Sequence, residues 1–161
     1  MSDPYFCDLD IQFSWMNNVY NELRSAIKCN SWYSSPSKQC RIDINPNLTS
    51  IIAASLPFTI SDCGIFKNNP GWKYGIHKDA SRTVAINILL VDPCPDFDIL
   101  YYSDIFDKTI PTIYERDVPK LLNTKKFHSV ANRSLTITRY VMSIGHTGNS
   151  YEEIKKKFHN V

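Results

Sequence analysis

The sequence has no C-x-x-C pair, no long apolar run and almost no net charge, and each absence excludes a class of function. The five cysteines are an odd number without metal-ligand spacing, so neither a thiolate zinc site nor a disulfide framework is expected. No apolar stretch approaches the roughly 20 residues of a membrane-spanning helix, and residues 1–10 lack the apolar segment of a signal peptide. A net charge of +2 gives no strong signal for nucleic acid as a partner. We therefore expect a protein of the reducing cytoplasm that does not bind membranes, and the sequence carries no strong signal for nucleic acid.

The length and the composition suit one domain that spans residues 1–161. Nine tyrosines, eight phenylalanines and three tryptophans favour β structure. Near the N-terminus, apolar residues recur at helical steps and predict a helix that packs on the core through Phe13, Met16, Tyr20, Leu23 and Ile27. A second short helix is expected at Leu48–Leu56, where Pro57 ends it.

From Phe58 onward the pattern changes to short strands that are separated by turn residues. The candidate strands are Phe58–Phe66, Trp72–Asp79, Thr83–Val91, Ile99–Tyr102, Thr112–Tyr114, Lys120–Leu122, His128–Val130 and Leu135–Gly145. Loops are expected at Ser34–Ser37 and Asp92–Pro95. Several short strands at regular spacing predict a β-sandwich or barrel, and the capping box at Ser150–Glu153 predicts a final helix.

The stretch His77-Lys78-Asp79 contains two residue types that bind metal ions. Residues i and i+2 of a strand project from the same face, so an extended backbone would direct this imidazole and this carboxylate into one space. His128, from another strand, would complete a 2-His-1-carboxylate arrangement, which binds Fe(II) and leaves coordination positions open. An isolated H-x-D match is a weak signal, and a lone histidine at a strand end is more often a hydrogen-bonded structural residue. We interpret His146 and His159 in that structural way.

Arg139 interrupts an apolar strand. On an extended backbone it shares one face with Leu135, Ile137, Val141 and Ser143. An arginine in an apolar row is costly unless it pairs with an anion, and its planar guanidinium suits a carboxylate. Either an internal ion pair or an anionic co-substrate would provide that anion, and a metal site nearby favours the co-substrate.

Two segments resemble the motifs of one enzyme family. Trp72–Asp79, followed by Ala85–Ile88, resembles the H-x-D strand of the 2-oxoglutarate/Fe(II)-dependent oxygenases, closest to the aspartyl/asparaginyl and prolyl hydroxylases and their microbial and phage relatives. Leu122–Asn132 resembles the segment that carries the distal histidine. The resemblance implies a mainly β fold, a double-stranded β-helix (jelly roll, cupin-like) with its core at about 58–145. The N-terminal helices and a short C-terminal helix would lie outside that core.

The resemblance also implies the cofactors and their ligands. His77, Asp79 and His128 would bind Fe(II) and form the catalytic centre, and Arg139 would bind the distal carboxylate of 2-oxoglutarate. O₂ would be the other co-substrate. Arg133 lies close to Arg139 in the sequence, so the choice between them depends on strand phase.

Two further residues are candidate contacts of 2-oxoglutarate. Arg82 qualifies because some hydroxylases of this type use a second arginine after the H-x-D pair. Tyr74 and its aromatic neighbours Trp72, Tyr101 and Tyr102 would either line the mouth of the site or pack in the core.

The implied reaction is the hydroxylation of a small molecule or a peptide, with release of succinate and CO₂ from 2-oxoglutarate. One alternative is a cupin-type metal-dependent isomerase or dioxygenase that does not use 2-oxoglutarate. Another is a non-catalytic jelly-roll binding module. The sequence indicates neither the substrate nor the oligomeric state.

Overall fold

The computed structural model describes residues 4–34, 39–91, 97–103, 105 and 107–159. Within these residues the elements follow one another as β1 (Phe6–Asp8), α1 (Met16–Cys29), β2 (Tyr33–Ser34), β3 (Cys40–Asp43), α2 (Pro46–Ala54), β4 (Asp62–Asn68), β5 (Lys73–His77), β6 (Val84–Leu89), β7 (Phe97–Tyr102), β8 (Thr109–Thr112), β9 (Lys120–Asn123), β10 (His128–Asn132), β11 (Arg139–His146) and α3 (Tyr151–His159). The expected loops at Ser34–Ser37 and Asp92–Pro95 lie outside the described residues, except for Ser34, which belongs to β2. Among the described helices, none combines the length and the apolar character needed to cross a membrane.

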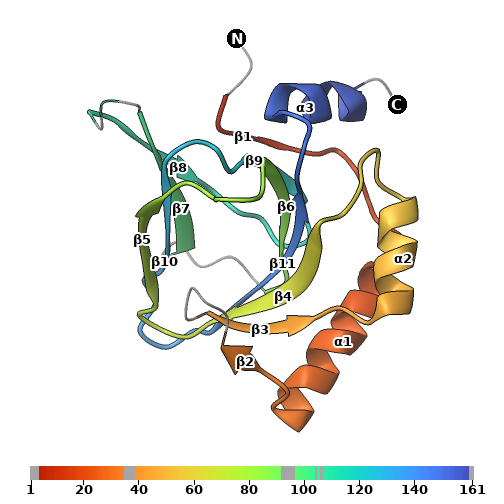
Figure 1. Cartoon of the computed structure of the whole chain (residues 1–161). Coiled ribbons are helices and arrows are strands. Elements are labelled where there is room, and N and C mark those ends of the chain that lie inside the picture. The colour runs from red at the N-terminus through yellow and green to blue at the C-terminus, as the bar shows by residue number, and fades with distance from the viewer. Residues whose placement is uncertain (1–3, 35–38, 92–96, 104, 106, 160–161) are drawn as a thin grey trace.

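Two antiparallel sheets face each other (Figure 1). The larger sheet has the strand order β1-β9-β6-β11-β4-β3-β2, and the smaller has the order β5-β10-β7-β8, which leaves β5 at an edge. Helices α1 and α2 lie against the larger sheet, on the side away from the smaller one (Figure 1). This arrangement confirms the prediction of a mainly β jelly roll with helices outside the strands.

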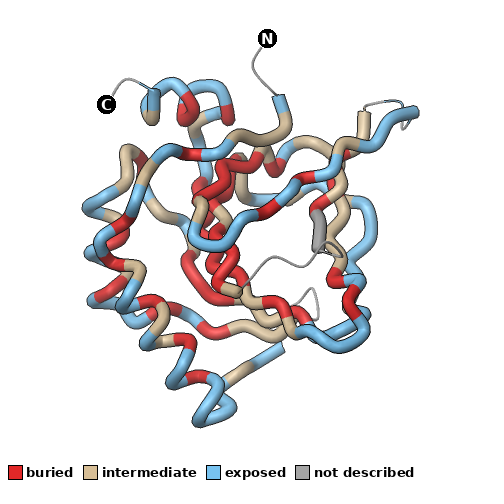
Figure 2. The backbone as a smooth tube through the Cα atoms, turned by 180° about the vertical axis from the view of Figure 1, so that it is seen from behind, coloured by how far each residue is buried: buried red, intermediate tan, exposed pale blue. Residues whose placement is uncertain are grey.

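The central strand β11 contributes side chains to both faces of the larger sheet, one toward the helices and one toward the smaller sheet. Successive residues of a strand point to opposite faces. Met142 and Ile144 are fully buried in the core that the helices cover. Arg139, Val141 and Ser143 line the space between the two sheets. Burial is accordingly concentrated in the middle of the molecule (Figure 2).

The predicted apolar stripe of the first helix packs on the core except at its last residue. Phe13 and Leu23 are buried and Met16 and Tyr20 are partly buried against the same core, whereas Ile27 is 50% exposed. The helix also buries Val19 and Ala26, so its most deeply buried positions are shifted from the predicted stripe and Ile27 falls outside them.

The last strand also begins later than predicted, at Arg139. Leu135 is 86% exposed and Ile137 is 45% exposed, so they do not continue the inward face of the strand. The cause is a turn in which Asn132 Nδ2 donates to the carbonyl of Ile137 and Ser134 Oγ accepts from the backbone N–H of the same residue. These side-chain bonds replace the ladder that an extended strand would need.

The C-terminal helix α3 begins with the predicted capping box. The backbone N–H of Ser150 donates to Glu153 Oε2 at 2.7 Å, and the N–H of Glu153 donates to Ser150 Oγ at 3.3 Å. Ile154 is fully buried and Phe158 packs against the same core, as the pattern predicts.

We expect Ser150→Ala to lower the free energy of unfolding by about 1 kcal/mol, because the cap satisfies a helix-end N–H that alanine leaves without a protein partner. Urea denaturation measures this change. Ser50→Ala is the matched control, since the exposed Ser50 hydroxyl only donates back to the carbonyl of Pro46 inside α2. An equal loss in both variants would contradict the capping role.

Candidate metal centre and co-substrate pocket

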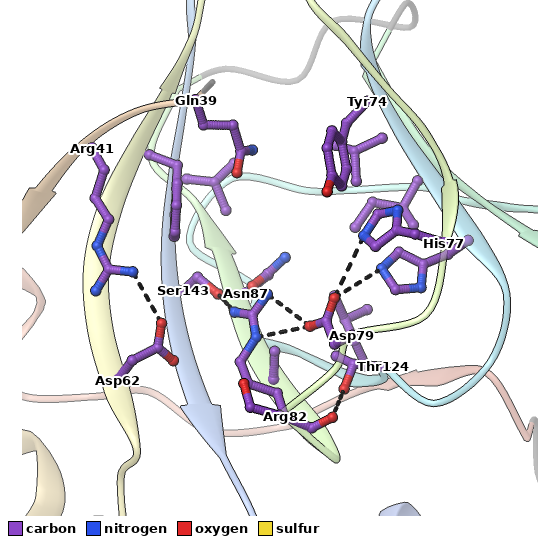
Figure 3. A pocket seen from close by; sticks show the side chains of 18 of the residues that line it. Gln39, Arg41, Asp62, Tyr74, His77, Asp79, Arg82, Asn87, Thr124 and Ser143 are labelled. Atoms are coloured by element: carbon purple, nitrogen blue, oxygen red, sulfur yellow. Dashed lines mark hydrogen bonds and ion pairs between the residues drawn. The ribbon is translucent and has the colours of Figure 1, made fainter. Parts of the chain in front are cut away.

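A cavity of about 590 Å³ lies between the two sheets. One wall is formed by β5, β10 and the loop after β5, and the opposite wall by β3 and β4 (Figure 3). Strands β6 and β11 contribute Asn87, Arg139 and Ser143 between these walls. The cavity therefore collects side chains that are far apart in the sequence.

The three predicted metal ligands meet at one wall of this cavity. His77 ends β5 and His128 begins β10, and the two residues are direct partners across the strand pair. The Nε2 atoms of His77 and His128 lie 3.5 Å and 3.7 Å from Asp79 Oδ1. One ligand atom from each of the three residues falls within 4.8 Å of the others.

The position of Asp79 arises differently from the prediction. Strand β5 ends at His77, so Asp79 lies in the following loop and strand alternation does not orient it. Its backbone N–H instead donates to the carbonyl of Thr124 at 3.0 Å. The loop turns the carboxylate back toward the imidazoles (Figure 3).

Both histidines are held in the tautomer that a metal ligand requires. His77 Nδ1 lies 2.7 Å from the carbonyl of Gly75, and His128 Nδ1 lies 2.9 Å from the carbonyl of Lys126. A carbonyl oxygen only accepts hydrogen bonds, so each Nδ1 carries the proton. Nε2, the ring nitrogen that faces Asp79, is then the atom through which each histidine can bind a metal.

The protonation states are suited to cation binding. Burial lowers the pKa of His128 from its ordinary value of 6.5. Burial alone would raise the pKa of Asp79, but the interaction with His77 and the charge of Arg82 outweigh it, so this pKa is lowered from 3.8. Near neutral pH the site therefore presents an ionised carboxylate and a neutral His128 imidazole.

We expect the affinity for a divalent cation such as Co(II) to decrease as the pH falls from about 7 to about 5, because protons compete for the imidazole lone pairs. The lowered pKa of His128 delays that competition to more acidic pH at this ligand. Co(II) titrations followed by visible absorption at each pH measure the effect. A constant or rising affinity on acidification would contradict imidazole ligation.

The donor set fits a ferrous ion. Metal–nitrogen and metal–oxygen bonds of about 2.1 Å place neighbouring ligand atoms of an octahedral ion about 3 Å apart. The observed spacings of 3.5 Å and 3.7 Å are slightly wider, so small side-chain shifts would complete the coordination. Two imidazoles and one carboxylate are the ligands typical of non-haem Fe(II) oxygenases.

Arg139 lies deeper in the same cavity. It is 2% exposed, its guanidinium carbon lies 5.2 Å from the centre of the Tyr114 ring, and its strand partner on β4 is Asn68.

Asn68 is 1% exposed and also lines the cavity, and among the described residues its Nδ2 has no hydrogen-bond partner. A buried donor without an acceptor costs about 1–3 kcal/mol. A carboxylate beside Arg139 would satisfy Asn68, so the two side chains fit the distal carboxylate of 2-oxoglutarate.

The other predicted co-substrate contacts fall in different places. Arg82 lines the cavity, and its guanidinium forms an ion pair with Asp79 at 2.8 Å. Tyr74 also lines the cavity, with its ring edge-to-face on His77 at 4.4 Å. Arg133 is exposed and lies outside the described cavity lining, so of Arg133 and Arg139 only Arg139 reaches the cavity. Arg41 of β3 lines the opposite wall, where its guanidinium forms an ion pair with Asp62 at 3.0 Å.

Two residues, Tyr101 and His146, have surroundings that indicate a structural role. Tyr101 is fully buried and packs on Tyr5 and Phe6, so the alternative that it lines the mouth is wrong. Its position on β7 directs its ring into the core between the sheets. His146 Nδ1 bonds the carbonyl of Thr59 at 2.7 Å, which agrees with the structural interpretation of this histidine.

Sequence reasoning missed Asn68. The expected strand ended at Phe66, whereas β4 continues to Asn68 and pairs there with Arg139. A polar residue after an apolar strand is an ordinary end signal, so only the strand pairing distinguishes Asn68 from a loop asparagine.

Neither a protein-family model nor a curated protein matches the sequence. Solved structures do match. A prolyl-4-hydroxylase of Pseudomonas putida is 12% identical with a TM-score of 0.65, over 89% of this chain and 91% of that chain. A prolyl hydroxylase from Trichoplax adhaerens, solved with a hypoxia inducible factor peptide fragment, is 14% identical with a TM-score of 0.63, over 98% and 87%. The non-heme alpha ketoglutarate dependent carbocyclase SnoK from nogalamycin biosynthesis is 10% identical with a TM-score of 0.67, over 89% and 79%. At these identities the likeness concerns the fold, and the chain has the jelly-roll fold of 2-oxoglutarate/Fe(II) oxygenases.

Proposed function

We propose that the protein is an Fe(II)- and 2-oxoglutarate-dependent dioxygenase that hydroxylates a small molecule or a peptide and releases succinate and CO₂. The observation that carries the proposal is the convergence of His77, Asp79 and His128 in the same cavity as the buried Arg139. The fold alone would not suffice, because one fold serves many functions. The ligand set and the position of the guanidinium are what favour this reaction.

The chain's own residues have distinct tasks in the proposed reaction. His77, Asp79 and His128 would hold Fe(II), which would supply the chemistry that couples 2-oxoglutarate to O₂. Arg139 binds the distal carboxylate of 2-oxoglutarate, and Asn68 donates a second hydrogen bond to it. The oxo-acid end of the molecule is thereby directed toward the metal ligands.

Apolar side chains between the two polar ends would keep water out of the cavity. They come from four strands of the two sheets: Ile99, Leu122, Val130 and Val141. A dry surrounding strengthens the attraction between a guanidinium and a carboxylate. It also protects reactive species from solvent.

We propose that residues 1–161 form one catalytic domain, because both sheets contribute side chains to the same cavity. The proposed location is the cytoplasm. The four described cysteines are free thiols, and thiols persist best in a reducing compartment.

The decisive experiment combines anaerobic calorimetry with a turnover assay. 2-Oxoglutarate is titrated into protein loaded with Mn(II), which does not support turnover under these conditions, and succinate is then measured with Fe(II) in air. We expect 2-oxoglutarate to bind only when a metal is present. Metal binding without 2-oxoglutarate binding would favour a cupin-type isomerase or a dioxygenase that does not use 2-oxoglutarate. Protein that binds no metal would favour a non-catalytic jelly-roll binding module.

A further inference from the structure

The side chain of Arg82 covers one oxygen of Asp79 and leaves the other uncovered. Its Nε and Nη2 atoms both contact Asp79 Oδ2, each at 2.8 Å. Its Nη1 donates to Ser143 Oγ on β11 at 3.2 Å. The three nitrogens of this guanidinium thus have partners inside the cavity, as Figure 3 shows.

The two oxygens of Asp79 therefore face different groups. Oδ2 accepts from Arg82, whereas Oδ1 faces His77 and His128 at 3.5 Å and 3.7 Å. We propose that Arg82 is a positioning residue, which holds Asp79 so that it offers a single oxygen to the metal. This inference rests on the metal site of the proposed function and assigns Arg82 a task other than binding 2-oxoglutarate.

The need for such a residue follows from the position of Asp79 outside β5. A strand would fix the direction of its side chain, but a loop does not. The loop 78–82 is instead bonded to the turn between β9 and β10. Thr124 Oγ1 donates to the carbonyl of Arg82 at 2.8 Å, and Lys125 Nζ donates to the carbonyls of Asp79 and Ala80, each at 3.0 Å.

The same turn leads directly into β10 and His128. The segment that carries the carboxylate and the segment that carries the distal imidazole are therefore joined by side-chain bonds as well as by strand pairing. Arg82 completes this connection from the side of β11.

The side chain of Arg82 passes close to β11 at Gly145, which has no side chain of its own. A Cβ atom at position 145 would lie 2.5 Å from Arg82 Cδ, closer than side-chain atoms pack, and 1.9 Å from Asp62 Oδ1. A side chain at position 145 would therefore force both Asp62 and Arg82 to move from the positions that they occupy.

Two other roles for Arg82 make different predictions. An arginine that anchors 2-oxoglutarate would, when replaced, weaken 2-oxoglutarate binding at saturating metal. An ion pair that only stabilises the loop would change thermal stability without changing the coordination of a metal. A positioning residue changes the metal affinity itself, and loss of such hydrogen-bond partners typically weakens metal binding about 10- to 100-fold.

The test is a Co(II) titration followed by visible absorption, which reports both the affinity and the ligand geometry without turnover. Arg82→Met removes the charge and keeps most of the side-chain length, and Arg82→Lys restores one donor. We expect Arg82→Met to weaken Co(II) binding by about 10- to 100-fold with an altered Co(II) spectrum, and Arg82→Lys to recover part of the affinity. Arg24→Met is the matched control, because Arg24 is exposed on α1 and bonds only its neighbour Asn21 in the described contacts.

Each outcome decides between the roles. Co(II) affinity and spectrum of Arg82→Met equal to those of the parent protein would overturn the inference, and so would an equal loss in Arg24→Met. A parent protein that binds no Co(II) would instead overturn the proposed metal site. If Arg82→Met does not fold, Ser143→Ala removes only the bond at Nη1 and is expected to weaken Co(II) binding several-fold, with no effect counting against the inference.

Discussion

The His77→Ala variant is expected to form no succinate above the background without enzyme, and to bind Fe(II) or Co(II) too weakly to measure. His77 supplies one of the three ligands that the described part of the chain brings together, and the two that would remain are a carboxylate and one imidazole. Loss of one of the three ligands weakens the binding of a ferrous ion strongly, because water must replace the missing imidazole. Succinate release in the presence of Fe(II), 2-oxoglutarate and air measures the loss even before a substrate is known.

A histidine outside the cavity provides the control for this variant. His159 is exposed at the end of α3, where its Nδ1 bonds the carbonyl of Lys155, so His159→Ala should keep full succinate formation. Circular dichroism of the metal-free proteins tests whether His77→Ala is folded. Unchanged succinate formation by folded His77→Ala would rule out His77 as a ligand.

The Arg139→Met variant is expected to lose 2-oxoglutarate binding while it keeps metal binding. Truncating one partner of a buried charge pair costs about 2–5 kcal/mol, so the affinity for 2-oxoglutarate should fall by about 30-fold or more. Methionine retains much of the arginine's length and apolar contact, which limits the disturbance of the core. Anaerobic calorimetry with Mn(II) gives both affinities from the same preparation.

Arg133→Met is the matched control for the co-substrate anchor, because Arg133 is exposed and lies only a few positions earlier in the chain. It should bind 2-oxoglutarate like the parent protein. The reverse result, with loss in Arg133→Met and none in Arg139→Met, would show that strand phase was assigned to the wrong arginine. Full binding by both variants would favour an enzyme that does not use 2-oxoglutarate.

The sequence was sufficient to bring out the residues of the candidate centre, because the H-x-D motif and the distal histidine have recognisable neighbours in the chain. The apolar run that forms β6 likewise indicates a strand buried on both faces, and its successive residues Ile88 and Leu89, which point to opposite faces, are both fully buried. These features depend on local pattern, and local pattern is what a sequence displays.

Features that depend on contacts between distant segments could not be predicted. Asn68 reaches the cavity because β4 pairs with β11 in a register that opposes it to Arg139. The ion pair of Arg82 with Asp79 requires a loop whose course is fixed by Thr124, more than forty positions away. Nothing in the neighbouring residues of either side chain indicates these partners.

The pairing of His77 with His128 has a thermodynamic consequence for the margin of the smaller sheet. β5 is the outermost strand there and hydrogen-bonds only β10 within its sheet, and the two imidazoles occupy the same rung of that ladder. A cation shared by both rings would act as a cross-link between the two strands, and its binding energy would oppose fraying of the outer one. The binding of iron and the pairing of β5 with β10 would then be thermodynamically linked.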